Sequence, residues 1–219
     1  MKTRTREYFE IELQNILLIH FNAKYYFVDV KYLNNPETTK EMIAAGEYPY
    51  IKRIRIAFWR LGIIEIAKLF QKSKNQHYNL IDYLESLISG YDQYTWLHGT
   101  NKDRLINWLS TLESEKIKKL RGNIDIQRNQ YFAHTDKSPS IKLENSQMSF
   151  ENIEELIMLT ENIIFELKAK VLRVHADMEI PCLERAGNIL EAYVAFKEKR
   201  EAEMKREWDD FEKENLKTK

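Results

Sequence analysis

Four prolines and an apolar repeat of three and four residues restrict most strongly what this chain can fold into. Pro36, Pro49, Pro139 and Pro181 divide the sequence, and a proline starts or ends a helix more readily than it occurs inside one. The long blocks between them place apolar side chains at the spacing that brings them to one helix face. Only 6 of the 219 residues are glycine, which excludes a turn-rich β fold. The sequence therefore predicts an all-α protein.

The repeat also predicts where the helices lie. They are expected at 9–34, 51–70, 80–89, 100–109, 117–134 and 149–171, and again after 181. The helix at 51–70 is apolar on most of its circumference and is expected to be the most buried. Asn79, Ser149 and Thr100 are expected as N-caps, with Asp103 completing a capping box at Thr100. The helices before and after the loop around Pro139 are expected to pack antiparallel.

Composition excludes several classes of protein. The 34 basic and 34 acidic side chains cancel, so nucleic acid would have to be held by a local basic patch and not by net charge. Cys182 is the single cysteine and can form neither an intrachain disulfide nor a cysteine metal cluster. No apolar stretch is long enough for a signal sequence or a membrane span. We expect a soluble, cytoplasmic protein.

The composition changes after Pro181. Residues 198–219 are mostly charged, so we predict a helical domain at 1–180 and a long, charged helical extension at 181–219. Two interpretations of the extension remain open. It is either a solvated helix stabilised by ion pairs or a dimer or partner seam through Met204, Trp208 and Phe211.

The segment RNQYFAHTD, at 128–136, has the side chains that cleave a phosphodiester without a metal. Arg128 has a permanent planar charge that can pair with phosphate oxygens. His134 can exchange a proton with a ribose 2′-hydroxyl or a leaving 5′-oxygen. Asn129 can bind the phosphate or orient the imidazole. On an ideal helix Arg128 and His134 are about 120° apart in rotation and roughly 9 Å apart along the axis, so the arginine must lean over or a two-fold dimer must bring the pairs together.

RNQYFAHTD resembles the signature of the HEPN superfamily, an arginine followed after four to six residues by a histidine. Together with IIEIAKLF at 63–70, it is most similar to the abortive-infection, AbiU-like branch. The resemblance implies a dimeric all-α bundle and a metal-independent endoribonuclease with Arg128, Asn129 and His134 in its site. Toxins, antitoxin partners and phage defence are typical of such proteins. Some relatives have a modified tyrosine after the histidine, where this chain has Thr135 and Asp136.

Other residues are candidates for supporting roles. Glu65 lies on an apolar stripe, and it positions Arg128, forms an ion pair with Arg60 or Lys68, or faces water. The basic residues before the motif are candidates for binding RNA phosphates, or they form a solvated face. They are Lys116, Lys118, Lys119 and Arg121. Tyr131 is a candidate for stacking on a base, or it packs in the core.

Alternatives to catalysis remain open. His134 can be a hydrogen-bonded core or capping residue while Arg128 makes a surface salt bridge. The same groove can bind RNA, nucleotide or a protein partner without cleavage, or the chain can be a structural dimer. The histidines are too scattered to predict a metal site, and with no phosphate-binding loop in the sequence we predict no cofactor.

Overall fold

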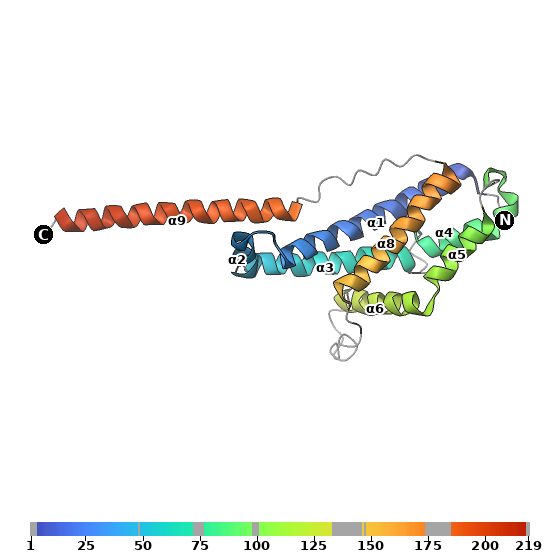
Figure 1. The fold of residues 1–219 in the computed structure, drawn as a ribbon, viewed down its shortest axis with the longest axis horizontal. Helices are drawn as coiled ribbons and strands as arrows, with labels where there is room; N and C mark the ends of the chain where they lie inside the picture. The colour runs from blue at the N-terminus through green and yellow to red at the C-terminus, as the bar shows by residue number, and fades with distance from the viewer. Residues whose placement is uncertain are drawn as a thin grey trace. The chain divides into compact units, whose positions relative to one another are not determined.

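In the computed structural model the described residues are 4–47, 49–71, 77–97, 101–132, 146, 148–173 and 185–217. Every regular element within these ranges is helical, and they contain no strand (Figure 1). The α-helices are α1 (Arg6–Asn34), α2 (Thr39–Glu47), α3 (Pro49–Phe70), α4 (Leu80–Ser89), α5 (Lys102–Leu112), α6 (Glu115–Phe132), α8 (Phe150–Glu166) and α9 (Arg185–Lys217). The shorter helices are η1 (Tyr91–Gln93), η2 (Thr95–Leu97) and the π-helical η3 (Leu167–Leu172). The all-α prediction is confirmed for these ranges.

Local signals in the sequence set the ends of α4 and α8. The side chain of Asn79 accepts the Asp82 amide N–H at 2.7 Å, and Gly90 follows the last residue of α4. Ser149 and Asn152 exchange side-chain and backbone hydrogen bonds in a capping box at the start of α8. These bonds satisfy amide groups that the first helical turn leaves without a partner. The predicted caps Asn79 and Ser149 are therefore confirmed.

One predicted helix cap is wrong, and one helix was not predicted. The N-cap of α5 is Asn101, whose side chain accepts the Asp103 N–H at 2.8 Å, so the predicted cap at Thr100 is wrong. α2 has no counterpart among the predicted helices. It begins with a capping box in which Thr38 Oγ1 accepts the Glu41 N–H at 3.2 Å and Glu41 Oε2 accepts the Thr38 N–H at 3.0 Å.

The prediction that α3 is the most buried helix is wrong. Ile56 is 44% exposed and Leu61 is 38% exposed, although both belong to the apolar stripes of this helix. Burial becomes dense only from Gly62 onward, where a Cβ atom would lie 2.8 Å from the ring of Phe27 in α1. The missing side chain allows α3 to approach α1 closely at this point.

The chain divides into two compact units. The first consists of Met1–Phe27 and Phe58–Glu179, and the second of Val28–Ala57 and Ile180–Lys219. The predicted extension, 181–219, thus belongs to the second unit, together with the end of α1, α2 and the start of α3.

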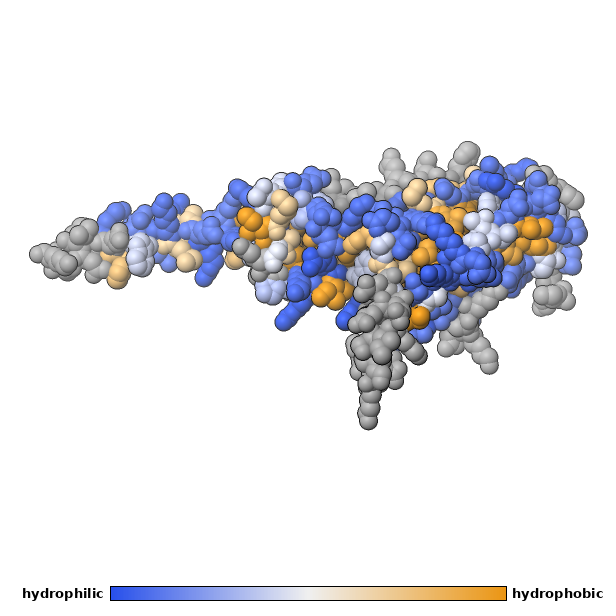
Figure 2. Space-filling view, turned by 60° about the horizontal axis from the view of Figure 1, so that its bottom comes forward, coloured by the Kyte–Doolittle hydropathy of each residue, from blue (hydrophilic) through white to orange (hydrophobic). Residues whose placement is uncertain are grey.

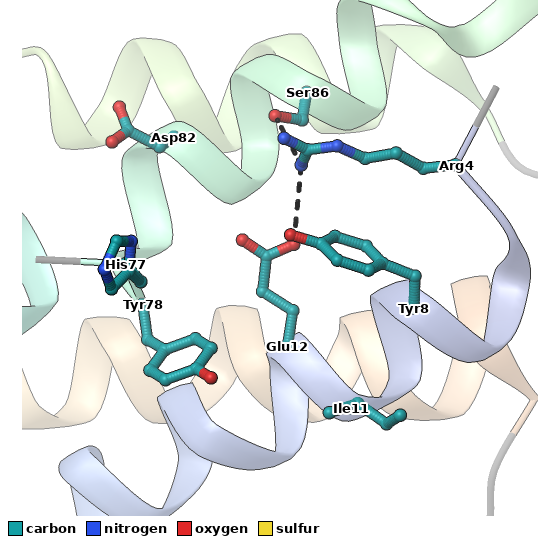
Figure 3. A pocket seen from close by; sticks show the side chains of 8 residues that line it. All are labelled: Arg4, Tyr8, Ile11, Glu12, His77, Tyr78, Asp82 and Ser86. Atoms are coloured by element: carbon teal, nitrogen blue, oxygen red, sulfur yellow. Dashed lines mark hydrogen bonds and ion pairs between the residues drawn. The ribbon is translucent and has the colours of Figure 1, made fainter. Parts of the chain in front are cut away.

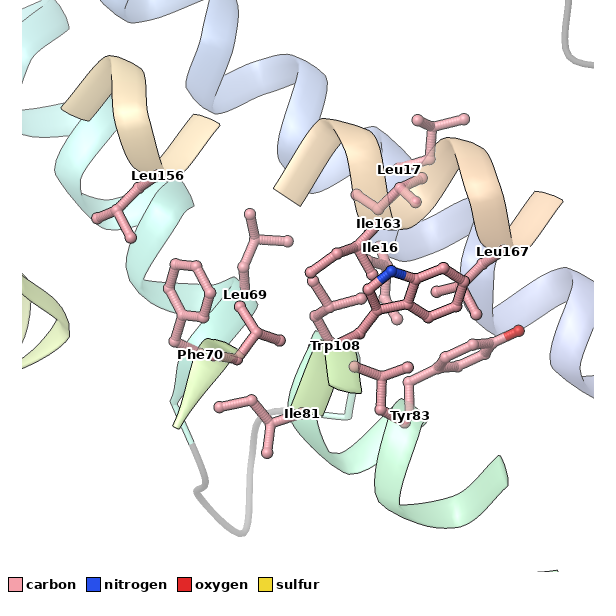
Figure 4. Packing of buried hydrophobic residues seen from close by; sticks show 14 of the residues in the cluster. Ile16, Leu17, Leu69, Phe70, Ile81, Tyr83, Trp108, Leu156, Ile163 and Leu167 are labelled. Atoms are coloured by element: carbon pink, nitrogen blue, oxygen red, sulfur yellow. The ribbon is translucent and has the colours of Figure 1, made fainter. Parts of the chain in front are cut away.

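The first unit has one apolar core, shared by α1, the end of α3, α4, α5, α6 and α8. Figure 4 shows part of it, with Ile16, Leu69, Ile81, Trp108 and Ile163 from five of these helices. The Phe9 ring in α1 also packs edge-on against Tyr83, with 5.5 Å between ring centroids. Burying one such side chain contributes about 1.5 to 3 kcal/mol to folding.

In the second unit α2 packs against the start of α9. Tyr32 donates a hydrogen bond to Glu41 Oε1 at 2.9 Å, and Lys40 pairs with Glu198. Leu33, Ile51 and Leu190 are buried. Residues 198–211 and Lys213, in α9, are exposed.

His20 is buried in the core of the first unit without a full set of hydrogen bonds. Its Nδ1 lies 3.1 Å from Thr160 Oγ1, while Nε2 lies 3.9 Å from Glu161 Oε2 and has no hydrogen-bond partner among the described residues. Burial lowers the pKa of His20 to about 4; the charge of Glu161 opposes this shift, and that of Lys24 adds to it. The ring is therefore neutral at pH values well above 4.

Lowering the pH from about 7 to about 5 should remove about 2 kcal/mol of the free energy of unfolding through His20 alone. The unfolded histidine takes up a proton near pH 6.5, whereas the folded one does so only near 4, so this stability is lost as the pH falls between those values. Urea unfolding of the wild type and of His20→Gln at both pH values measures the difference. An identical pH dependence in the two proteins would contradict it.

Candidate functional site

Arg128 and Asn129 lie side by side in the last turns of α6. The Arg128 guanidinium donates to Asn129 Oδ1 from Nε at 3.2 Å and from Nη2 at 2.5 Å. Arg128 is half-buried and Asn129 is exposed. Among the described residues Arg128 forms no ion pair, and its guanidinium donates to this amide oxygen.

Asp125, one turn before Arg128, shapes the electrostatics of this end of α6. Burial raises the pKa of the Asp125 carboxyl, and the charges of Arg128 and Arg121 oppose the shift. The two arginines and Asp125 are three and four residues apart and so share one helix face. The charge of Asp125 therefore interacts with those of Arg128 and Arg121 along this face of α6.

The predicted contact of His134 and the predicted stacking by Tyr131 fall on positions that the structure does not describe in full. His134 is beyond the end of α6, and the side chain of Tyr131 is not described although its backbone is helical. The meeting of Arg128 with His134 stays a prediction.

The predicted phosphate-binding cations are mostly paired with carboxylates. The pairs are Lys116 with Glu155 at 2.5 Å, Lys118 with Glu113 at 3.3 Å and Arg121 with Glu113 at 2.8 Å. The hydrogen bond from Arg121 is the main reason why the pKa of Glu113 is lowered. Lys119 is exposed and forms no ion pair with any residue that the structure describes. Of the four, Lys119 is thus the one open to a phosphate without first breaking a pair.

Glu65 forms one of the ion pairs that the sequence left open. Its Oε1 accepts from Lys68 Nζ at 2.5 Å, and its side chain is 15% exposed. The pair joins residues one turn apart on α3. In the described part of the chain Glu65 is therefore a partner of Lys68, and it makes no contact with Arg128.

A pocket of about 420 Å³ lies between the start of α1 and α4 (Figure 3). It is lined by Arg4, Tyr8, Ile11, Glu12, His77, Tyr78, Asp82 and Ser86. None of these residues was predicted to belong to a site. A signal existed for Glu12, which is three residues after Phe9 and so lies on the apolar face of α1, where a carboxylate is unexpected.

Glu12 has an unusual environment for a carboxylate. The residue is 6% exposed, and its Oε2 has no hydrogen-bond partner among the described residues. Among the described residues it forms an ion pair with Arg4, whose Nη1 lies 3.7 Å from Oε2. Burial raises the pKa of Glu12; the charge of Arg4 opposes the shift, and that of Asp82 adds to it.

The described residues form neither a metal-binding cluster nor a membrane-spanning helix. They contain no group of three or more histidine, cysteine, aspartate or glutamate side chains that can hold a metal ion. None of their helices is long and apolar enough to span a membrane. Comparison of the chain with protein-family models, with curated proteins and with solved structures gives no match.

Proposed function

We propose that this protein is a metal-independent endoribonuclease of the HEPN type, with a role as a toxin or in phage defence. The observation that carries the proposal is the Arg128–Asn129 contact, in which the guanidinium rests on an amide and keeps its charge available for a phosphate. The all-helical fold of the described residues is compatible with a HEPN-type antiparallel bundle. The sequence RNQYFAHTD supplies the histidine that the chemistry needs.

In the proposed reaction a ribose 2′-oxygen attacks the adjacent phosphorus. The bond from phosphorus to the 5′-oxygen breaks, which leaves a 2′,3′-cyclic phosphate and a 5′-hydroxyl. His134 takes the proton from the 2′-hydroxyl or gives one to the leaving 5′-oxygen. Arg128 neutralises the charge that develops on the phosphorane oxygens.

The observed contact supports a specific role for Asn129 in the proposed reaction. A guanidinium can only donate hydrogen bonds, so the amide atom that faces Arg128 must be the oxygen. The NH₂ group of Asn129 then remains as a donor for a phosphate oxygen or for the imidazole of His134. Asn129 both holds the guanidinium and adds a neutral donor beside it.

Cleavage in the presence of a chelator tests the proposal. A labelled single-stranded RNA incubated with the protein and excess EDTA should shorten with time, and mass spectrometry should find 2′,3′-cyclic phosphate ends. The same RNA with 2′-O-methyl groups should stay intact because it lacks the attacking hydroxyl. Salt-sensitive binding without any cleavage would instead favour a non-catalytic RNA-binding protein.

The apolar residues of α9 favour a second candidate function, that of a protein-interaction dimer. Met204, Trp208 and Phe211 are 58%, 63% and 58% exposed, and at about 100° per residue they lie within an arc of roughly 60°. On the face shown in Figure 2, α9 is mostly hydrophilic with separate apolar side chains. An antitoxin protein is the other partner that the proposed function implies.

The charges along α9 favour a second copy of the chain as the partner. Residues 197–206 have five basic and three acidic side chains, and residues 207–214 have one basic and five acidic side chains. Antiparallel pairing of two copies places the basic segment of each beside the acidic segment of the other. The same pairing covers the apolar side chains of both helices.

The substitution Trp208→Glu should therefore shift the protein from dimer to monomer, with a dissociation constant raised by at least about 100-fold because a charge enters an apolar seam. Ala202→Glu is the matched control, since Ala202 is exposed and lies on the opposite side of α9. Sedimentation equilibrium over a range of protein concentrations measures the dissociation constant of the wild type and of each variant. A monomeric wild type, or equal effects of the two substitutions, would refute the α9 dimer.

A further inference from the structure

The pocket between α1 and α4 combines carboxylates with aromatic rings. Glu12 and Asp82 contribute the acidic groups, and Tyr8 and Tyr78 contribute the rings (Figure 3). Carboxylates and the faces of aromatic rings both attract positive charge. The volume of about 420 Å³ is within the usual range of small-molecule sites, roughly 300 to 1,000 Å³.

The carboxylate of Glu12 determines which ligand chemistry suits the pocket. Its Oε2 is buried and accepts no hydrogen bond from the described residues, and the Arg4 guanidinium, 3.7 Å away, is too distant to donate one. A buried charged oxygen without a donor is costly. An N–H donor with a positive charge would both satisfy this oxygen and balance its charge.

The position of the Arg4 guanidinium indicates where a positively charged N–H donor can bind. Its guanidinium carbon lies 4.9 Å from the centre of the Tyr8 ring, and Nη1 lies 3.4 Å from Ser86 Oγ. Both polar contacts of Arg4 in the pocket are long, and its side chain remains 43% exposed. A cation from the chain itself therefore lines the pocket without forming a close pair with Glu12.

We propose that this pocket binds a small organic cation with an alkylguanidinium or alkylammonium head group, which displaces the Arg4 guanidinium and donates a hydrogen bond to Glu12 Oε2. The ring of Tyr8 covers one side of the bound head group. A metal ion is not the ligand class that these side chains suit, because the described residues form no metal-binding group of three. The pocket shares no residue with the proposed ribonuclease site, so either proposal can fail without the other.

Isothermal titration calorimetry of the full chain with propylguanidinium tests the proposal, with propylurea as the uncharged ligand of the same shape. The cation should bind and the urea should not. Glu12→Gln should weaken binding of propylguanidinium roughly 10- to 100-fold, the loss expected for a hydrogen bond to a charged group. Glu10→Gln is the matched control, because Glu10 is on the same helix and pairs with Arg6 outside the pocket. It should bind like the wild type.

Two more variants make the test independent of how well Glu12→Gln folds. Arg4→Ala removes the competing guanidinium and should tighten binding, and Tyr8→Leu should weaken it roughly 2- to 5-fold through loss of the cation–π contact. Equal binding of propylguanidinium and propylurea would overturn the proposal, as would wild-type affinity in Glu12→Gln or weaker binding in Arg4→Ala.

Discussion

Replacing His134 with alanine is expected to slow RNA cleavage by roughly 10²- to 10⁴-fold, the usual contribution of a general acid or base. The protein should keep its helical content, since the substitution removes no side chain of the described core. Single-turnover cleavage of a labelled RNA measures the chemical step. Circular dichroism checks the fold.

The control for this prediction is His175→Ala. His175 is outside RNQYFAHTD, so its loss should leave the cleavage rate within about 2-fold of the wild type if His134 alone does the acid–base work. Arg128→Ala should slow cleavage as His134→Ala does, because each removes transition-state stabilisation. A His134→Ala protein that cleaves as fast as the wild type would exclude this histidine from the mechanism.

Replacing Leu13 with alanine should lower the free energy of unfolding by about 2 to 5 kcal/mol. Leu13 is completely buried in the core of the first unit, so the substitution removes buried apolar surface and leaves a cavity. Urea unfolding measures the loss, followed by circular dichroism at 222 nm, where α-helices give a strong negative signal.

Leu18→Ala is the matched control for Leu13→Ala. Leu18 is on the same helix and is 58% exposed, and a surface substitution of this kind changes stability by about 0.5 kcal/mol or less. Equal losses at the two positions would mean that α1 does not pack through the face that contains Leu13.

The positions of the helices were predictable where short-range features of the sequence determine them. The apolar repeat and the caps Asn79 and Ser149 are short-range features, and α4 and α8 begin where they predict. The missed helix α2 also had a local signal, Thr38 followed by Glu41, in a segment too short for a clear apolar repeat. Exposure of Ile56 was not predictable, because burial depends on which faces of α3 other helices cover.

The candidate site was also predictable only where its contacts join residues that are close in sequence. The Arg128–Asn129 contact joins neighbours in the sequence and was within reach of sequence analysis. The ion pair of Lys116 with Glu155 joins residues 39 positions apart. The run of basic residues around Lys116 therefore could not indicate that the charge of Lys116 is paired. The pocket around Glu12 brings together side chains from α1 and α4, and such a site emerges only when the helices pack.

The central claim is that Arg128 and His134 act on the same phosphate. A crystal structure of the protein with a 2′-O-methyl RNA, which binds without being cleaved, measures it directly. We expect one phosphate within hydrogen-bond distance of the Arg128 guanidinium and of a His134 ring nitrogen, from the same or a partner chain. A His134 ring buried against main-chain atoms, with the RNA bound elsewhere, would contradict the claim.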